Sequence, residues 1–189
     1  TKIISEEDVK EVTDYPVIGH VFNNHNIYPG NTLMLDKPNS PASEPYRAIR
    51  TKISLIVKEK ERPVIAVTSI FPNEGKTYNA INIASSYALI RRRTVLLDLD
   101  LRNSKMAETF NIQSDTGVVN YVIGKANLDD ITVDTKHPDL KIIPSGPIPP
   151  HPGEMLSDKK IPELMEKLKK YYDVIIIDSP PIGYVADLF

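Results

Sequence analysis

The stretch that decides the fold runs from Val64 to Thr77 and reads VIAVTSIFPNEGKT. Its first four residues are apolar and mostly β-branched, which favours a buried strand. A polar loop with a proline and a glycine follows, and we expect a helix from Lys76 to about Arg91. The segment therefore predicts a strand, a loop and a helix in direct succession.

Three further apolar runs repeat this pattern along the chain. They lie at Thr94–Leu97, Leu140–Ile143 and Val174–Ile177, and the last follows an amphipathic helix predicted for Ile161–Tyr172. Near-continuous apolar strands are typical of a parallel sheet that is buried on both faces, with helices as crossovers. We therefore predict an α/β fold with a doubly wound, mostly parallel sheet. Ligands of such sheets bind beyond the carboxyl ends of the strands.

The chain before this core divides into an arm and a helix. Residues 1–43 hold short apolar pieces between Pro, Asn and Gly, so we expect an extended arm that packs on the rest without a core of its own. A helix is predicted from Glu44 to about Lys60, because apolar residues recur every three or four positions. Ser43 is placed to cap it. The predicted domains are thus an arm (1–43) and a core domain (44–189).

Composition excludes several classes of site. The 189 residues carry a formal net charge of -2, which gives no reason to expect nucleic acid as a partner. The chain has no cysteine, and its four histidines are scattered without metal-ligand spacing. No signal peptide or long apolar run is visible, so we expect this chain as given to be soluble and cytoplasmic.

The loop after the first strand matches most of the phosphate-binding pattern G-x-x-x-x-G-K-[S/T]. Gly75, Lys76 and Thr77 agree with it, whereas Ile70 stands at the position of the first glycine. Asn73 is a residue that reaches the left-handed backbone conformation without glycine. Backbone amides at residues 73–78 would surround the phosphates, with a helix N-terminus behind them. The alternative is a helix start that contains Gly-Lys-Thr by chance.

Acidic residues follow two other strands. Asp98 and Asp100 come after the second run in the sequence DLDLR, and Asp178 ends the fourth run before Ser-Pro-Pro. Taken singly, DLDLR is compatible with a solvated acidic turn, and many buried strands end in Asp. Because all three segments follow parallel-type strands, the fold brings them to one edge of the sheet. A phosphate cradle, a hydroxyl and three carboxylates together favour Mg²⁺-ATP as the ligand.

From about Pro16 to its end, the chain resembles the bacterial tyrosine kinases of capsule and exopolysaccharide export. Their Walker A motif resembles Pro72–Thr77, and their second motif, three apolar residues and D-x-D-x-R, resembles Val95–Arg102. Their Walker B motif resembles Ile175–Pro181. The related MinD and ParA ATPases usually carry a signature lysine early in the loop, where this chain has Phe71. The resemblance implies a P-loop NTPase-like fold related to theirs and ATP-dependent transfer to tyrosine.

The resemblance assigns roles to the motif residues. Lys76 would bind the β and γ phosphates, and residues Asn73, Glu74, Gly75, Thr77 and Tyr78 would complete the nucleotide site. Thr77, Asp100 and Asp178 would hold Mg²⁺, the two carboxylates through water. Asp98 would accept the proton of the tyrosine or orient its hydroxyl, and Lys76, Asp98, Asp100 and Asp178 together would form the catalytic set.

Further implications concern assembly and location. The family carries E-x-x-R-x-x-R, matched by Glu44, Arg47 and Arg50, on a helix that mediates a ring-like homo-oligomer. A solvated helix face is the alternative for these three residues. Implied partners are a membrane polysaccharide co-polymerase or adaptor and a cognate tyrosine phosphatase. The implied location is the cytoplasmic face of the bacterial inner membrane, with transmembrane helices upstream of Thr1 or in the adaptor.

The sequence departs from the family at two places. Asn73 stands where the family usually has glycine, and the chain ends at Phe189, before a tyrosine-rich tail. We expect the fold to continue with further helices and strands. Two other functions stay open at this point. One is a MinD/ParA-like ATPase switch, and the other is a non-catalytic regulator that binds nucleotide weakly or not at all.

Overall fold

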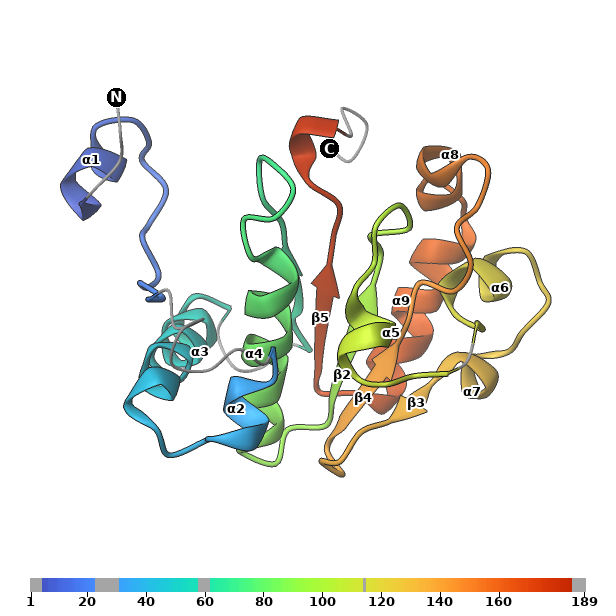
Figure 1. Ribbon diagram of the computed structural model, residues 1–189, viewed down its shortest axis with the longest axis horizontal. Helices are drawn as coiled ribbons and strands as arrows, with labels where there is room; N and C mark the ends of the chain where they lie inside the picture. Colours follow the sequence, from blue (N-terminus) through green and yellow to red (C-terminus); the bar gives the residue numbers. More distant parts are fainter. Residues whose placement is uncertain (1–4, 23–30, 58–61, 114, 185–189) are drawn as a thin grey trace.

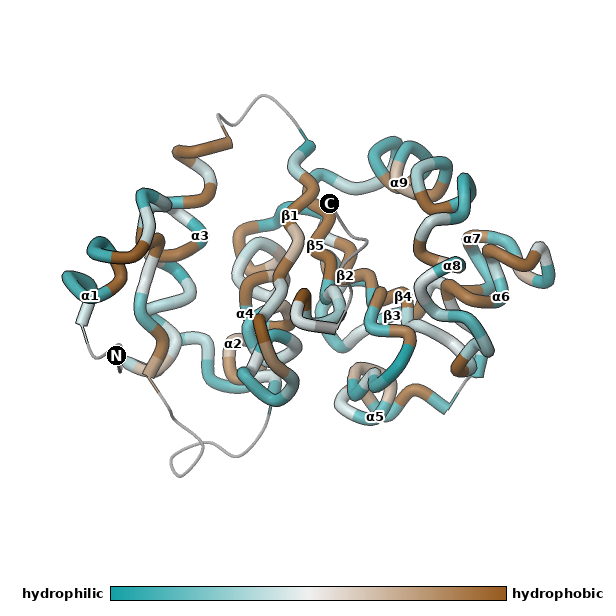
Figure 2. Tube along the Cα trace, turned by 90° about the horizontal axis from the view of Figure 1, so that it is seen from above, coloured by the Kyte–Doolittle hydropathy of each residue, from teal (hydrophilic) through white to brown (hydrophobic). Residues whose placement is uncertain are grey.

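The computed structural model describes residues 5–22, 31–57, 62–113 and 115–184. These residues form a five-stranded sheet in the order β1-β5-β2-β4-β3 (Figures 1 and 2). The strands are β1 (Val64–Val67), β2 (Thr94–Asp98), β3 (Val133–Asp134), β4 (Leu140–Ile143) and β5 (Val174–Asp178). β1, β5, β2 and β4 pair in parallel, and β3 pairs antiparallel with β4. The predicted mostly parallel α/β sheet is confirmed.

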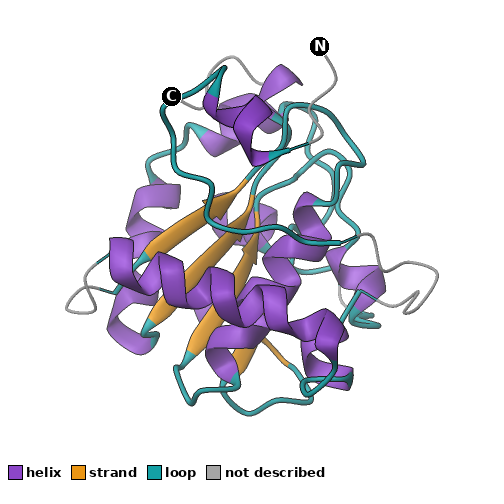
Figure 3. Cartoon of the chain, turned by 90° about the vertical axis from the view of Figure 1, so that its left-hand side faces the viewer, coloured by secondary structure: helices purple, strands orange, loops and turns teal. Residues whose placement is uncertain are grey.

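Helices cover both faces of the sheet (Figures 1 and 3). One face carries α2 (Leu33–Asp36), α3 (Glu44–Ile56) and α4 (Lys76–Ala88), and α5 (Met106–Thr109) packs at its edge through Met106. The other carries α6 (Val118–Val122), α7 (Leu128–Ile131) and α9 (Lys160–Tyr171). The remaining helical elements are α1 (Glu6–Lys10), α8 (Pro152–Leu156) and the 3-10 turns Pro41–Ser43 and Ile182–Tyr184.

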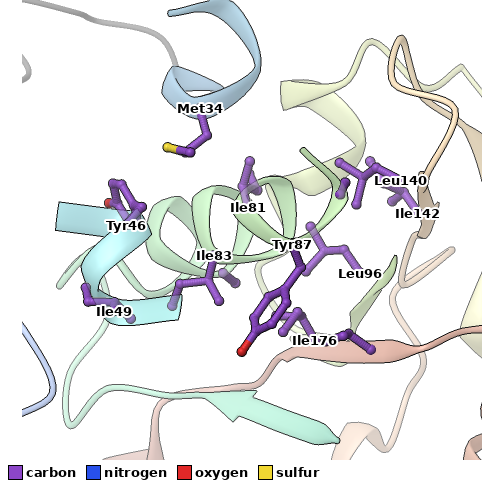
Figure 4. Close-up of a cluster of buried hydrophobic side chains, with 14 of the residues drawn as sticks. Met34, Tyr46, Ile49, Ile81, Ile83, Tyr87, Leu96, Leu140, Ile142 and Ile176 are labelled. Carbon is purple, nitrogen blue, oxygen red and sulfur yellow. The ribbon is translucent and has the colours of Figure 1, made fainter. Parts of the chain in front are cut away.

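Alternate residues of the central strands supply two separate cores. Leu96 of β2 and Ile176 of β5 face α4, while Val95 of β2 and Ile175 of β5 face α9. Strands that must be apolar on both sides read as continuous hydrophobic runs, and Figure 2 shows β2 and β5 as such. Figure 4 shows the first core gathered around α4. This packing holds α4, and with it the loop before it, rigidly against the sheet.

The structure corrects several sequence-based expectations about the arm and its helix. Leu33 and Met34 lie in a short helix and are fully buried in the first core, so this part of the arm is not extended. Ser43 does not cap α3, because its hydroxyl donates instead to the carbonyl of Lys37. α3 ends at Ile56, and Lys60 lies outside the described residues. The short elements α1, α2, α5, α6, α7, α8 and β3 were not predicted.

The other predicted elements differ from the structure by a few residues at most. β2 and β5 each extend one residue further, to Asp98 and Asp178. α4 ends at Ala88 rather than near Arg91, because Arg91 takes a left-handed conformation (φ 64°) in the turn to β2. Among the described residues, no helix has the length and apolar character needed to cross a bilayer.

Candidate nucleotide and phosphoryl-transfer site

The loop between β1 and α4 depends on two residues with positive φ. Asn73 has φ 65° and Gly75 has φ 89°. Asparagine is one of the few residues with a side chain that occupies this region readily, so the substitution at position 73 preserves the loop's conformation. The Glu74 carboxylate accepts hydrogen bonds from the backbone amides of Ile70 (3.0 Å) and Phe71 (2.9 Å). This contact closes the loop on itself.

The sheet register brings the predicted carboxylates together. Asp98 and Asp178 are paired positions at the carboxyl ends of the neighbouring strands β2 and β5, and Val67 of β1 pairs with Asp178 on its other side. Asp100 follows two residues after β2, and its backbone amide donates to Asp98 Oδ1 (3.0 Å). The three acids and the loop before α4 therefore meet at one end of the sheet, as the parallel pattern predicted (Figure 1).

Lys76 carries the positive charge in this acidic cluster. Its Nζ lies 2.6 Å from Asp100 Oδ2 and 3.9 Å from Asp178 Oδ1, and all three side chains are less than one tenth exposed. Asp178 Oδ1 is buried, and no hydrogen bond to it is found within the described part of the chain. A buried carboxylate oxygen without a donor is unfavourable unless a cation compensates it. The ammonium of Lys76 stands where such a cation is needed.

Burial changes the acidity of two of these carboxyl groups. Loss of solvation raises the pKa of Asp98 to about 7, against hydrogen bonds from Ser104 and the Asp100 amide that lower it. Loss of solvation also raises the pKa of Asp178 to about 6, and the Thr77 hydroxyl and the Lys76 charge oppose this rise. A carboxyl group with a pKa near neutrality is suited to act as a proton acceptor in catalysis.

A cavity of about 580 Å³ opens over this end of the sheet. Its wall includes Asp100, whereas Asp98 and Asp178 are buried next to it. The predicted nucleotide-binding residues that line it are Asn73, Gly75, Lys76, Thr77 and Tyr78. Glu74 does not line it, because its carboxylate is bound to the loop amides.

The residues present fit a magnesium ion that arrives with phosphates. Among the described residues, no group of three His, Asp or Glu side chains is placed to hold a metal ion by itself. Mg²⁺ in nucleotide sites is usually bound by one or two carboxylates together with substrate phosphates and water. Asp100, the orphaned oxygen of Asp178 and the Thr77 hydroxyl are the donor types required. Lys76 already places one cationic group among them.

Several cavity residues were not predicted from the sequence. Asn31 comes from the arm, Asn103 and Lys105 follow the DLDLR segment, and Pro180 follows β5. Positions 103, 105 and 180 could have been inferred, because they directly follow strand ends that point to the site. Asn31 has no such signal, since it lies 33 residues before the first strand of the sheet.

The predicted assembly residues on α3 make contacts within the chain. Arg47 donates to Glu44 and to the carbonyl of Pro38, and Arg50 donates to the carbonyl of Ser86 on α4 (2.8 Å). Glu44 remains mostly exposed. These bonds fix the direction of the two guanidinium groups. The interface expected at Glu44, Arg47 and Arg50 stays a prediction.

Comparison with known proteins identifies named relatives of this chain. A family model described as an AAA domain matches residues 63–186. Tyrosine-protein kinase CpsD of Streptococcus agalactiae is 40% identical over 145 residues, which cover 76% of this chain and 62% of the relative. Tyrosine-protein kinase YwqD of Bacillus subtilis (strain 168) is 34% identical over 157 residues, or 83% of this chain and 66% of the relative. The chain thus spans just under two thirds of these proteins.

Solved structures extend the similarity to nearly the whole chain. The chimerical protein CapA2B2 superposes with a TM-score of 0.87 at 30% identity, over 97% of this chain and 78% of that one. The septum site-determining protein MinD of Pyrococcus horikoshii superposes with a TM-score of 0.52 at 24% identity, over 61% of this chain and 47% of that one. The second match shows a shared fold alone. With the AAA-domain match and the named relatives, these findings confirm the resemblance, and the chain belongs to the bacterial tyrosine kinase family.

Proposed function

We propose that this chain is the ATP-binding and catalytic part of a protein-tyrosine kinase that regulates capsular or exopolysaccharide polymerisation and export. The observation that carries the proposal is the pair of ion pairs from Lys76 to Asp100 and Asp178. They lie beside a cavity lined by the loop between β1 and α4. Relatives named tyrosine-protein kinase support tyrosine as the acceptor. The capsule-related role rests on the family resemblance.

In this reading, each residue acts by position and charge. The loop amides and Lys76 bind the phosphates of ATP. To do so, the Lys76 ammonium gives up its ion pair with Asp100 and pairs with phosphate oxygens instead. Thr77, Asp100 and Asp178 would hold Mg²⁺, which would supply positive charge to neutralise the phosphates. Asp98, with its pKa raised to about 7 by burial, accepts the phenolic proton as the tyrosine oxygen attacks. In the described structure each Asp98 oxygen accepts one hydrogen bond, from Ser104 or from the Asp100 amide, and keeps a second lone pair for the phenolic proton. Because Asp98 is fully buried next to the cavity, the segment that covers it must move before a tyrosine can reach it.

The substitution Lys76→Met tests the enzyme assignment. We expect it to abolish phosphotyrosine formation on a supplied tyrosine-rich peptide, because the γ phosphate loses its main cationic contact. Lys76→Met also removes the ion-pair partner of Asp100. Lys76→Arg keeps the positive charge and serves as a second variant. Circular dichroism checks that both variants fold. Undiminished transfer by both folded variants would refute the kinase assignment. Nucleotide-dependent dimers with water as the acceptor would instead indicate an ATPase switch.

Assembly and location follow as parts of the same proposal. The full protein would form a ring through Glu44, Arg47 and Arg50, with a membrane co-polymerase or adaptor as its partner and a cognate phosphatase to reverse its modification. It would then work at the cytoplasmic face of the inner membrane. Support for these points comes from the family alone.

A further inference from the structure

The arm contributes a residue to the wall of the nucleotide cavity. Asn31 is exposed on this wall, and Tyr78 from the first turn of α4 lines the same cavity. The two residues are joined through Asn82, whose side-chain amide donates to the carbonyls of Asn31 (3.0 Å) and Tyr78 (2.8 Å). The part of the wall formed by Asn31 is therefore fixed next to the start of the helix that holds the phosphates.

Asn82 clamps the arm to α4. It is fully buried, and its oxygen accepts a hydrogen bond from the backbone amide of Met34 (2.9 Å). Both amide hydrogens and the oxygen of Asn82 are thus used, two of the contacts being with the arm. A buried side chain that is fully hydrogen-bonded in this way holds its partners in one arrangement. The position of Asn31 is consequently set by the core and not by the surface.

The hydrogen bonds around Asn31 also determine which way its side-chain amide points. Its Nδ2 donates to the Thr109 hydroxyl (3.1 Å), and that hydroxyl donates to the carbonyl of Lys105 (2.8 Å). Because the Thr109 hydrogen is committed to Lys105, the hydroxyl accepts from Asn31, and Asn31 presents its oxygen elsewhere. Among the described residues, no donor to that oxygen is found.

We propose that Asn31 is a nucleoside-binding residue supplied by the arm, which accepts a hydrogen bond from an O–H or N–H group of the nucleotide. The proposal rests on the proposed function, since it takes Mg²⁺-ATP or Mg²⁺-ADP as the occupant. Lys76, Gly75 and Thr77 mark the phosphate end of the cavity, and Asn31 is an uncharged side chain on its wall, suited to the uncharged part of the ligand. Ribose hydroxyls and the exocyclic amine of adenine are the donors that the nucleoside offers.

A consequence is that the arm and the nucleotide stabilise one another. If the packing of the arm on α4 places Asn31 on the nucleotide, then by linkage bound nucleotide must stabilise this packing by the same factor. The Met34 amide reports on this directly, because its hydrogen bond to Asn82 must open before the proton exchanges. Saturation with Mg²⁺-ADP should slow exchange at Met34 in the parent chain, and by less in an Asn31→Ala variant.

Calorimetry on the full chain tests the contact. Asn31→Ala should weaken Mg²⁺-ADP about fivefold to tenfold, as expected for one lost hydrogen bond, and should leave inorganic pyrophosphate binding unchanged. Thr109→Val, which removes the hydroxyl that orients the Asn31 amide, should weaken Mg²⁺-ADP binding to a smaller degree. Asn39→Ala is the matched control, since it removes an arm asparagine that does not line the cavity.

Three analogues identify the donor. The effect of Asn31→Ala should vanish with 2′-deoxy-ADP or 3′-deoxy-ADP if a ribose hydroxyl is bound, and with inosine diphosphate if the adenine amine is bound. Equal Mg²⁺-ADP affinity of the parent and Asn31→Ala, an equal loss with pyrophosphate, or a loss that persists with every analogue would overturn the inference. Failure of the parent chain to bind Mg²⁺-ADP at all would overturn the proposed function as well, so the two failures are distinguishable.

Discussion

Replacing Asp98 by asparagine should remove a loss of stability that the protein without nucleotide shows as pH rises. The carboxyl group is fully buried, and its pKa is raised from 3.8 to about 7, mainly by loss of solvation. Asparagine has the same shape and keeps both local contacts. Its oxygen accepts from the Asp100 amide, and its nitrogen donates to the Ser104 hydroxyl, which reverses its role. The substitution therefore removes the charge. It leaves the second amide hydrogen and the Ser104 hydroxyl hydrogen without an acceptor among the described residues, a cost that does not depend on pH.

The sign and size of the effect follow from the two pKa values. Because the folded-state pKa lies above the unfolded one, the folded protein holds the proton between about pH 4 and 7, while the unfolded chain releases it. Stability thus falls as pH rises through this window and levels off above it. About two pKa units lie between pH 5 and the folded value, which corresponds to roughly 2–3 kcal/mol of stability lost between pH 5 and 8. Asp98→Asn has no such loss.

Urea denaturation at pH 5 and pH 8 measures this difference. The quantity to compare is the free energy of unfolding of Asp98→Asn minus that of the parent chain. We expect this difference to rise by roughly 2–3 kcal/mol from pH 5 to pH 8. Asp173→Asn is the control. Its ion pair with Arg93 lowers the pKa of Asp173, so the group is ionised in both states across this range, and its effect should not depend on pH. A pH-independent difference for Asp98→Asn as well would refute the reasoning.

Two further predictions concern packing and assembly. Gly117→Ala should lower the free energy of unfolding by about 3 kcal/mol in urea denaturation, because the new Cβ would lie 2.2 Å from the Pro144 carbonyl oxygen. Gly153→Ala is the control, and it should change the free energy of unfolding very little because the space around Gly153 is open. The triple change Glu44→Ala, Arg47→Ala and Arg50→Ala should lower the mass of any oligomer in light scattering, and an unchanged mass would exclude the ring role.

The sheet, and the edge of it that carries the candidate site, could be predicted because strands buried on both faces have an apolar sequence. Strands such as Val174–Asp178 are apolar on both faces, and parallel strands place whatever follows them at a common edge. This reasoning located Lys76, Asp100 and Asp178 without coordinates. It did not locate α1, α2, β3 or the helices α5 to α8, since elements of two to five residues are too short to show a period.

Asn31 could not be predicted for a different reason. Its place in the cavity depends on Asn82, a polar residue that is buried in a helix whose other buried positions are mainly small or apolar. From sequence alone, an asparagine at this position is equally compatible with an exposed helix face. Asn82 is buried and bonded to the arm only because α2 packs on α4 and buries Leu33 and Met34. This packing makes Asn82 a link between the arm and α4, the helix that follows the loop after β1.

The electrostatics of the site explain why nucleotide binding and stability should be coupled in this protein. Three carboxylates are buried at one end of the sheet, with Lys76 as the cation that contacts two of them. The raised pKa of Asp98, the raised pKa of Asp178 and the orphaned oxygen of Asp178 share one cause, which is negative charge placed away from water with too little compensation. Such an arrangement lowers the stability of the empty fold. Under the proposed function, Mg²⁺ bound together with nucleotide would supply the missing compensation, so nucleotide binding should stabilise the fold.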